Sequence, residues 1–192
     1  MNWLRGGDAD DDVFNEEGAY VPEHLPEPGA FLDGHEVLTG DDHLAVHAAS
    51  RERFEEFGVY DATFGYNLAQ LNRDTRHPDA GLRYAVDDAA PDVLRVEFTP
   101  TTAFCPQSGT LVTGIFRAWN AGESEYRLVS VRVAPMHQHS EATNEKLAGL
   151  EERYLETGEV AVEEGSPTAS GADDRETGAR EDGGSGAPSA PF

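Results

Sequence analysis

The chain has 192 residues, with 37 Asp or Glu against 14 Lys or Arg, and its formal net charge is −23. Such a field repels nucleic acid and anionic lipid, so nucleic-acid binding and membrane association are excluded as roles of the whole protein. A single cysteine cannot form a disulfide within the chain, and no apolar run is long enough for a signal peptide or a membrane span. We therefore expect a cytoplasmic protein adapted to concentrated salt, where screening weakens the self-repulsion of an acidic surface.

Acidic segments flank a central part that is richer in apolar residues. Residues 1–40 carry 10 acids and one arginine among many Gly and Pro, and residues 159–192 hold almost nothing that could be buried. Segments of this kind cannot offset their ordering entropy. We predict a disordered acidic N-terminal extension over 1–40, a folded domain over 41–158 and a disordered acidic tail over 159–192.

Two helices are predicted at the start of the domain. Asp42 can cap a helix that runs through Phe57 and is ended by Gly58, and Asp61 can cap a second helix. Apolar residues at roughly helical spacing are expected to form the buried side of each helix. They are Leu44, Ala48 and Phe54 in the first helix and Phe64, Leu68 and Leu71 in the second.

Strands are predicted over 82–86, 93–99 and 126–133. In the second strand, Leu94, Val96 and Phe98 alternate with polar residues, which favours a sheet with one face in water. A helix follows Cys105 with Pro106 at its first position, and Ser140 can cap a last helix. The sequence thus predicts an α+β domain in which a small sheet of about three strands is covered by helices on one face.

Cys105 is the first candidate for chemistry, because it stands where the helix after the second strand is expected to begin. Amide groups at a helix start stabilise a thiolate, and the thiolate is the form of cysteine that binds iron or attacks an electrophile. A lone cysteine is otherwise most often a small buried apolar residue. No base in a recognisable pattern accompanies Cys105, so the residues leave both interpretations open.

Histidines form two further candidate groups. His137 and His139 stand two residues apart in the loop before the last helix, where they could face one ligand or could be solvated loop residues and local caps. His43 and His47 are four residues apart on a predicted helix, near His35, and this spacing can chelate a metal ion, although no Glu follows the first histidine. Asp8, Asp10 and Asp12 imitate the start of a calcium loop, but the glycine and distal glutamate of that loop are missing.

Two stretches resemble one known family. VEFTPTTAFCPQSGTLVTGIFRAW and the later VRVAPMHQHSEATNEKLAGLEER are similar to the small iron–sulfur (metal–sulfur) cluster assembly factors, which include SufT, PaaD-type proteins and the eukaryotic cytosolic iron–sulfur assembly targeting subunit. The resemblance covers residues 58–156 and includes an acidic turn from Asp74 to Pro78. The family pattern matches Thr99, Pro100, Thr101, Cys105, Pro135, His137, Ser140, Glu141, Asn144 and Leu147.

The resemblance implies a factor that helps client iron–sulfur proteins mature, as a carrier or targeting adaptor and not as an enzyme. It makes Cys105 and His137 the candidate residues for a transiently held iron ion or iron–sulfur cluster. Thr101, Thr102, Asp74, Glu141 and His139 are the candidate supporting residues.

A lone cysteine cannot supply the usual four thiolates, so a cluster would be shared with a second chain, a partner or a small thiol. The expected partners are apo iron–sulfur clients and other assembly proteins, and a homodimer is also compatible with the sequence. The alternatives are an interaction adaptor in which Cys105 only packs, and a PaaD-type accessory protein for a ring-oxygenating enzyme.

Overall fold

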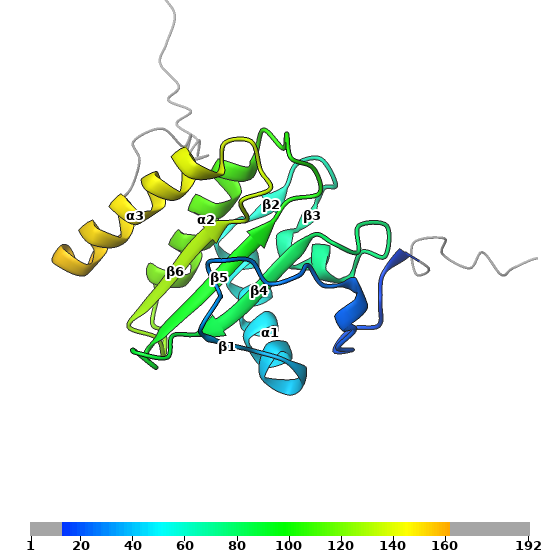
Figure 1. The fold of residues 1–192 in the computed structure, drawn as a ribbon, viewed down its shortest axis with the longest axis horizontal. Helices are drawn as coiled ribbons and strands as arrows, with labels where there is room; N and C mark the ends of the chain where they lie inside the picture. The colour runs from blue at the N-terminus through cyan, green and yellow to red at the C-terminus, as the bar shows by residue number, and fades with distance from the viewer. Residues whose placement is uncertain (1–12, 162–192) are drawn as a thin grey trace, which may run out of the picture. The chain divides into compact units, whose positions relative to one another are not determined.

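A computed structural model describes residues 13–161, which form the α+β fold that the sequence predicts (Figure 1). Its main sheet has four strands in the order β1-β4-β5-β6. Strand β4 (Gly81–Val86) is antiparallel to both β1 (Glu36–Val37) and β5 (Val93–Thr99), whereas β6 (Leu128–Val133) is parallel to β5. The sheet therefore has one strand more than the three predicted, the short β1.

Helices α1 (Gly40–Phe57) and α2 (Ser108–Asn120) lie behind the sheet in Figure 1, and α3 (Ser140–Thr157) lies beside β6. Two neighbouring strands that run parallel need a long crossover connection, and α2 lies in the connection between β5 and β6. Among the described residues, no helix combines the length and apolarity that crossing a membrane requires.

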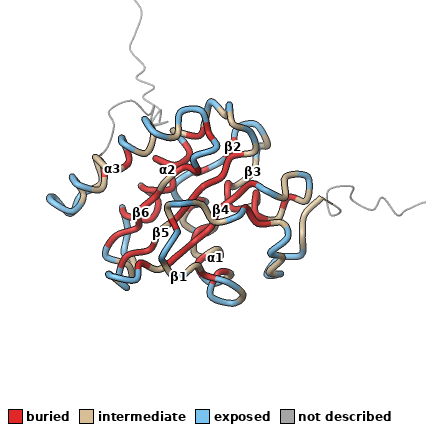
Figure 2. The backbone as a smooth tube through the Cα atoms, in the orientation of Figure 1, coloured by how far each residue is buried: buried red, intermediate tan, exposed pale blue. Residues whose placement is uncertain are grey.

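The core lies between the sheet and these helices, as the buried residues in Figure 2 indicate. The register aligns alternate residues across the three long strands, and Val96 is paired with Tyr84 on one side and with Val131 on the other. Because side chains alternate between the two faces of a strand, this register gathers one apolar row from each strand on the helix side. The rows are Leu82 and Tyr84 from β4, Leu94, Val96 and Phe98 from β5, and Val129, Val131 and Val133 from β6.

Helix α1 ends as predicted but buries a different side. Gly58 follows it with a left-handed φ of 69°, a conformation that suits glycine. The fully buried residues of α1 are His43, Val46, Ser50 and Phe54, whereas Ala48 is exposed. The prediction was therefore right for Phe54 and wrong for Ala48, because it overlooked the burial of His43 and of Ser50, whose hydroxyl donates to the Val46 carbonyl.

The second predicted helix is not formed. Residues from Asp61 onward instead make a small hairpin of β2 (Tyr60–Asp61) and β3 (Tyr66–Asn67), followed by the 3₁₀ helix η3 (Leu68–Arg73). Asp61 accepts hydrogen bonds at Oδ1 from the N–H groups of Thr63 and Phe64, at 2.7 and 3.2 Å. An aspartate can close a turn with the same bonds that would cap a helix, and here the turn forms.

The segment before α1, which we call the N-terminal strap (residues 13–39), is packed and not disordered as predicted for residues up to 40. Its residues around Gly29 and Phe31 cross the face of the sheet opposite α1 and α2 (Figure 1), whereas residues 18–25 lie against α1. Leu32 in the strap is 1% exposed, and the Gly29 N–H donates to Glu97 Oε1 at 2.6 Å. The Phe31 ring has the guanidinium groups of Arg95 and Arg132 at 4.8 and 5.2 Å from its centroid.

The expectation that one face of the sheet is in water was therefore wrong. The strap covers the face that carries Glu97, and Glu97 is 1% exposed. The described part thus begins well before residue 41 and continues to residue 161. The aspartates of the calcium-loop imitation and most of the predicted tail lie outside the described residues.

Helix α3 covers the free edge of β6 with polar side chains. The Asn144 side chain accepts from the Val133 N–H at 2.9 Å and donates to the Val133 carbonyl at 3.0 Å. Glu151 accepts from the Val131 N–H at 3.2 Å and pairs with Arg132. An edge strand otherwise presents unpaired backbone groups that can recruit another chain, and α3 occupies those of β6.

Candidate functional site

Cys105 lies in the loop that joins β5 to α2, and its side chain is partly exposed. Helix α2 begins at Ser108, so the cysteine precedes the helix by three residues and Pro106 is not the first helical residue. This corrects the prediction that Cys105 stands at the helix start. The loop instead folds into turns, in which the Cys105 N–H donates to the Thr102 carbonyl and the Ser108 N–H donates to the Cys105 carbonyl.

His137 is placed against this loop although it is 32 positions away in the sequence. Its Nε2 lies 2.9 Å from the Cys105 carbonyl oxygen and 3.0 Å from Ser108 Oγ, and its Nδ1 accepts the His139 N–H at 3.1 Å. A carbonyl can only accept and a backbone N–H can only donate, so these bonds put the imidazole proton on Nε2. His137 is 4% exposed. The two residues that the family resemblance singles out are therefore adjacent, and the imidazole holds the backbone of the cysteine.

A backbone bond adds to this link between the two loops. The Gln138 N–H donates to the Ala103 carbonyl at 2.9 Å. Ser108, which is 2% exposed, stands at the first position of α2 and bonds His137, so the helix start is joined to the same loop. The cysteine loop (residues 100–107) and the histidine loop (residues 134–139) thus form one surface at one end of the sheet.

The supporting candidates fall into different surroundings. His139 is exposed, although its ring lies 6.0 Å from that of His137, and Glu141 is exposed in the first turn of α3. Thr102 is exposed and Thr101 is half-buried. The structure thus brings His139 to the cysteine loop, and it leaves the Glu141 side chain in solvent.

Asp74 is buried among hydrogen-bond donors. It is 1% exposed and accepts from Tyr66 Oη at 2.8 Å and from the Arg76 guanidinium at 2.7 and 2.8 Å. Burial raises the pKa of Asp74, but the hydrogen bonds from Arg76 and Tyr66 outweigh it and hold the pKa at about 2. The turn that follows Asp74 lines an open hollow together with residues of both loops, among them Arg76, His77, Pro78, Thr101 and Met136.

Within residues 13–161, no group of three or more His, Cys, Asp or Glu side chains is arranged to hold a metal ion. The family resemblance points to the pair Cys105 and His137, which the structure joins through the Cys105 carbonyl. Both ring nitrogens of His137 take part in internal hydrogen bonds, so this imidazole would have to leave the Cys105 carbonyl in order to bind a metal through Nε2. The pair can accordingly offer a metal ion one thiolate from Cys105. It can add one imidazole once His137 has left the Cys105 carbonyl.

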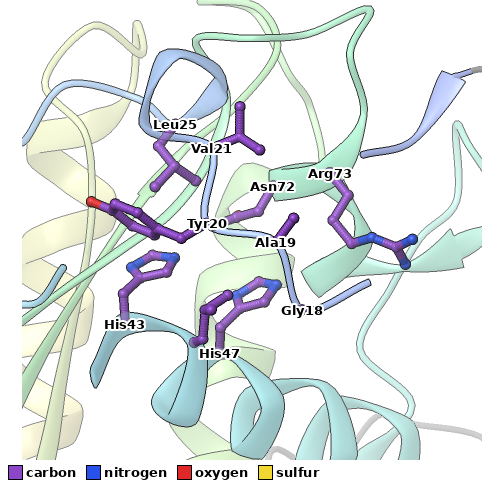
Figure 3. Close-up of a pocket in the computed structure, with 10 residues that line it drawn as sticks. Gly18, Ala19, Tyr20, Val21, Leu25, His43, His47, Asn72 and Arg73 are labelled. Carbon is purple, nitrogen blue, oxygen red and sulfur yellow. The ribbon is translucent and has the colours of Figure 1, made fainter. Parts of the chain in front are cut away.

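The histidines of α1 line a second cavity, shown in Figure 3 with Tyr20 over His43. The rings of His43 and His47 are stacked, with centroids 5.7 Å apart and planes 10° from parallel. His47 Nδ1 lies 3.0 Å from Tyr84 Oη, whereas the buried His43 Nδ1 has no hydrogen-bond partner. Burial lowers the pKa of His43 to about 3 and that of His47 to about 4.

The metal interpretation of these histidines is not supported. His35 lies apart from them, 3.8 Å from Asp87, and stacked parallel rings do not converge on one ion. The sequence reasoning also missed Ser108 and the exposed Phe104 and Met136 around Cys105. The only signal for them was the absence of charge in the surrounding stretches.

Comparison with known proteins gives a family but no activity. Residues 12–161 match the family described as a domain of unknown function, DUF7998. This match covers most of the chain, so the protein belongs to that family. No curated protein matches it.

Proposed function

We propose that this protein is an iron–sulfur cluster assembly or targeting factor, which carries iron or a cluster as cargo to client proteins and is not an enzyme. The observation that supports the proposal is the contact between the Cys105 loop and His137. The order of elements around this contact also agrees with the family pattern, in which a strand, a cysteine loop, a helix, a second strand and a histidine loop precede a last helix.

A carrier must hold its cargo and release it. The Cys105 side chain is partly exposed, so its sulfur can meet a partner without unfolding of the loop. One thiolate occupies only one position on an iron, and the remaining ligands must come from a partner, a second chain or a small thiol. A site of this kind binds weakly until a client supplies further thiolates, which favours transfer.

His137 is the positioning residue in this proposal. The hydrogen bond from its Nε2 to the Cys105 carbonyl fixes the loop that presents the sulfur. Thr101, Thr102, His139 and Glu141 remain proposed supporting residues around the cargo, whereas Asp74 acts through the turn that it stabilises.

The proposal is tested by anaerobic titration with ferrous iron and sulfide, followed by visible absorption. We expect a thiolate-to-iron band with the wild-type protein that Cys105→Ser and Cys105→Ala abolish. Circular dichroism should show an unchanged fold in both variants, because a partly exposed side chain leaves no large cavity. Equal bands in wild type and variants would contradict the proposal, and so would normal client maturation in cells that contain only Cys105→Ala.

The second candidate function is that of an interaction adaptor, and one observation favours it. Both ring nitrogens of His137 are engaged inside the protein, as in a residue whose role is to pack and to position. An adaptor would retain client maturation with Cys105→Ala and lose it when the exposed Phe104 beside the cysteine is replaced by aspartate. The two variants therefore separate the two functions.

A further inference from the structure

The two loops that carry Cys105 and His137 contain no charged side chain in an otherwise acidic chain, and the nearby Arg76 and Asp79 belong to the turn that lines a hollow with Thr101 and Met136. Nineteen consecutive residues between Glu97 and Arg117 contain no Asp, Glu, Lys or Arg, and this is the longest such stretch in the sequence. The eight residues between Arg132 and Glu141 contain none either. These stretches include the cysteine loop and the histidine loop, which the structure joins into one surface.

Large apolar side chains are exposed on this surface. Phe104 is 74% exposed and Met136 is 48% exposed, one on each loop. Apolar side chains that are exposed together on one surface are typical of interaction sites, whereas single ones are common on any protein. We call the surface the uncharged cap. Its exposed or partly exposed residues include Thr102, Phe104, Cys105, Pro106, Pro135, Met136, Gln138 and His139.

We propose that the uncharged cap is the interface between two copies of this chain. Two molecules that each carry a formal charge of −23 repel one another, and the repulsion is smallest where the contact contains no acid. A two-fold contact brings the same patch of both copies together, which an uncharged apolar patch tolerates and an acidic one does not. Concentrated salt screens the remaining repulsion and leaves the apolar contact as the driving force.

The interface stands independently of any cargo, because it depends on the cap and not on iron. Where the proposed function also holds, the interface supplies a second thiolate, which a single chain lacks. The second copy would bring a second Cys105 to the same surface.

The oligomeric state of the apo protein in molar salt tests the interface, by sedimentation equilibrium over a series of protein concentrations. We expect a monomer–dimer equilibrium that Phe104→Asp and Met136→Asp each shift toward monomer. Burying one such side chain is worth about 1.5–3 kcal/mol, so the loss in association constant should be tenfold or more. Leu155→Asp is the matched control, because Leu155 is 52% exposed near the end of α3, outside the cap.

The expected result is that the control keeps the dimer and the two cap variants lose it. A wild-type chain that stays monomeric at every concentration would overturn the proposal, leaving the cap to a partner of different sequence. A dimer that Leu155→Asp disrupts and Phe104→Asp preserves would overturn it as well.

Oxidation of the thiols gives a second readout that needs no iron. Diamide converts two thiols into one disulfide and is itself reduced to the hydrazine, taking up the two electrons and two protons. If the caps meet, Cys105 should form a covalent dimer in wild type and Leu155→Asp much faster than in Phe104→Asp. Equal rates in all three proteins would indicate random collision and would contradict the proposed interface.

Discussion

Histidine side chains have two different structural roles in this protein. His137 is a positioning residue because its ring nitrogens bond the Cys105 carbonyl and the His139 N–H across two loops. His43 is instead buried and His47 half-buried, both in the neutral form beneath the N-terminal strap, where desolvation lowers their pKa values to about 3 and about 4. The same residue type thus supports the candidate site in one place and makes the fold sensitive to acid in another.

Acid should therefore destabilise the protein through His43 and His47. Their folded pKa values lie below the unfolded value of about 6.5, so the unfolded chain binds protons first. The stability they contribute is complete above pH 6.5 and is lost as the pH falls toward 4. We expect the free energy of unfolding to decrease by about 1 kcal/mol per pH unit for each histidine in this range. Urea unfolding between pH 7 and pH 4.5 measures it.

The control for this prediction is His43→Phe, which keeps an aromatic ring beside Tyr20 and Tyr84 and cannot be protonated. Its free energy of unfolding should depend less on pH than that of the wild type. Parallel pH profiles for the two proteins would show that His43 does not titrate on unfolding in this range.

Among the elements, α3 has a role beyond covering the core. It satisfies the backbone of the edge strand β6 through Asn144 and Glu151. The family resemblance includes Asn144, and its two hydrogen bonds to Val133 give a structural reason for an amide at that position. The histidine loop lies between β6 and α3, so the attachment of the helix also limits the movement of that loop.

Replacing this amide tests the attachment. Asn144→Ala leaves the N–H and the carbonyl of Val133 without their side-chain partner, which should cost about 1–3 kcal/mol of unfolding free energy. Glu145→Ala, at the exposed neighbouring position, should change it by less than about 0.5 kcal/mol. Denaturant unfolding of the two variants measures the difference. Equal stabilities would mean that solvent replaces Asn144 at the edge of β6.

The N-terminal strap is the other element whose removal should matter. A chain beginning at residue 41 lacks the buried Leu25, Leu32 and Leu38, and each buried leucine contributes about 2 kcal/mol as an upper estimate. We expect this chain to unfold at a clearly lower denaturant concentration than one beginning at residue 13. Equal unfolding midpoints would show that the strap adds nothing to stability.

A single substitution probes the same contact without truncation. A Cβ at residue 29 would lie 2.6 Å from a Glu97 carboxylate oxygen, so Gly29→Ala should move the buried carboxylate or the strap and weaken the hydrogen bond between them, lowering the midpoint of denaturant unfolding. Gly149→Ala, where a Cβ meets nothing within 4 Å, is the matched control and should be neutral or slightly stabilising.

For the whole molecule, the excess of negative charge sets the dependence on salt. With 23 more acidic than basic residues, self-repulsion grows as salt is removed, because the Debye length increases. We expect the melting temperature to fall steadily from molar to millimolar potassium chloride. Sucrose, which strengthens burial without screening charge, should restore only part of the loss. A melting temperature independent of salt would count against an adaptation to concentrated salt.

The local signals of the sequence determined the three long strands, the end of α1 and the position of Cys105 after the second of these strands. These features depend on residues close together in the chain, such as the alternation in 93–99 and the glycine at position 58. The sequence also determined the negative charge of the molecule, which requires no fold. The candidate pair Cys105 and His137 came from family resemblance, and the contact between them did not follow from any local pattern.

Only the tertiary structure decided the features that depend on distant residues. Leu25, Leu32 and Leu38 follow no helical or strand period, so their packing on the sheet could not be expected from their spacing. The turn at Asp61 and a helix cap use the same hydrogen bonds, and the surrounding fold selected the turn. His43 is buried because the strap covers it, and His137 touches the Cys105 loop because parallel pairing brings the ends of β5 and β6 to the same edge of the sheet.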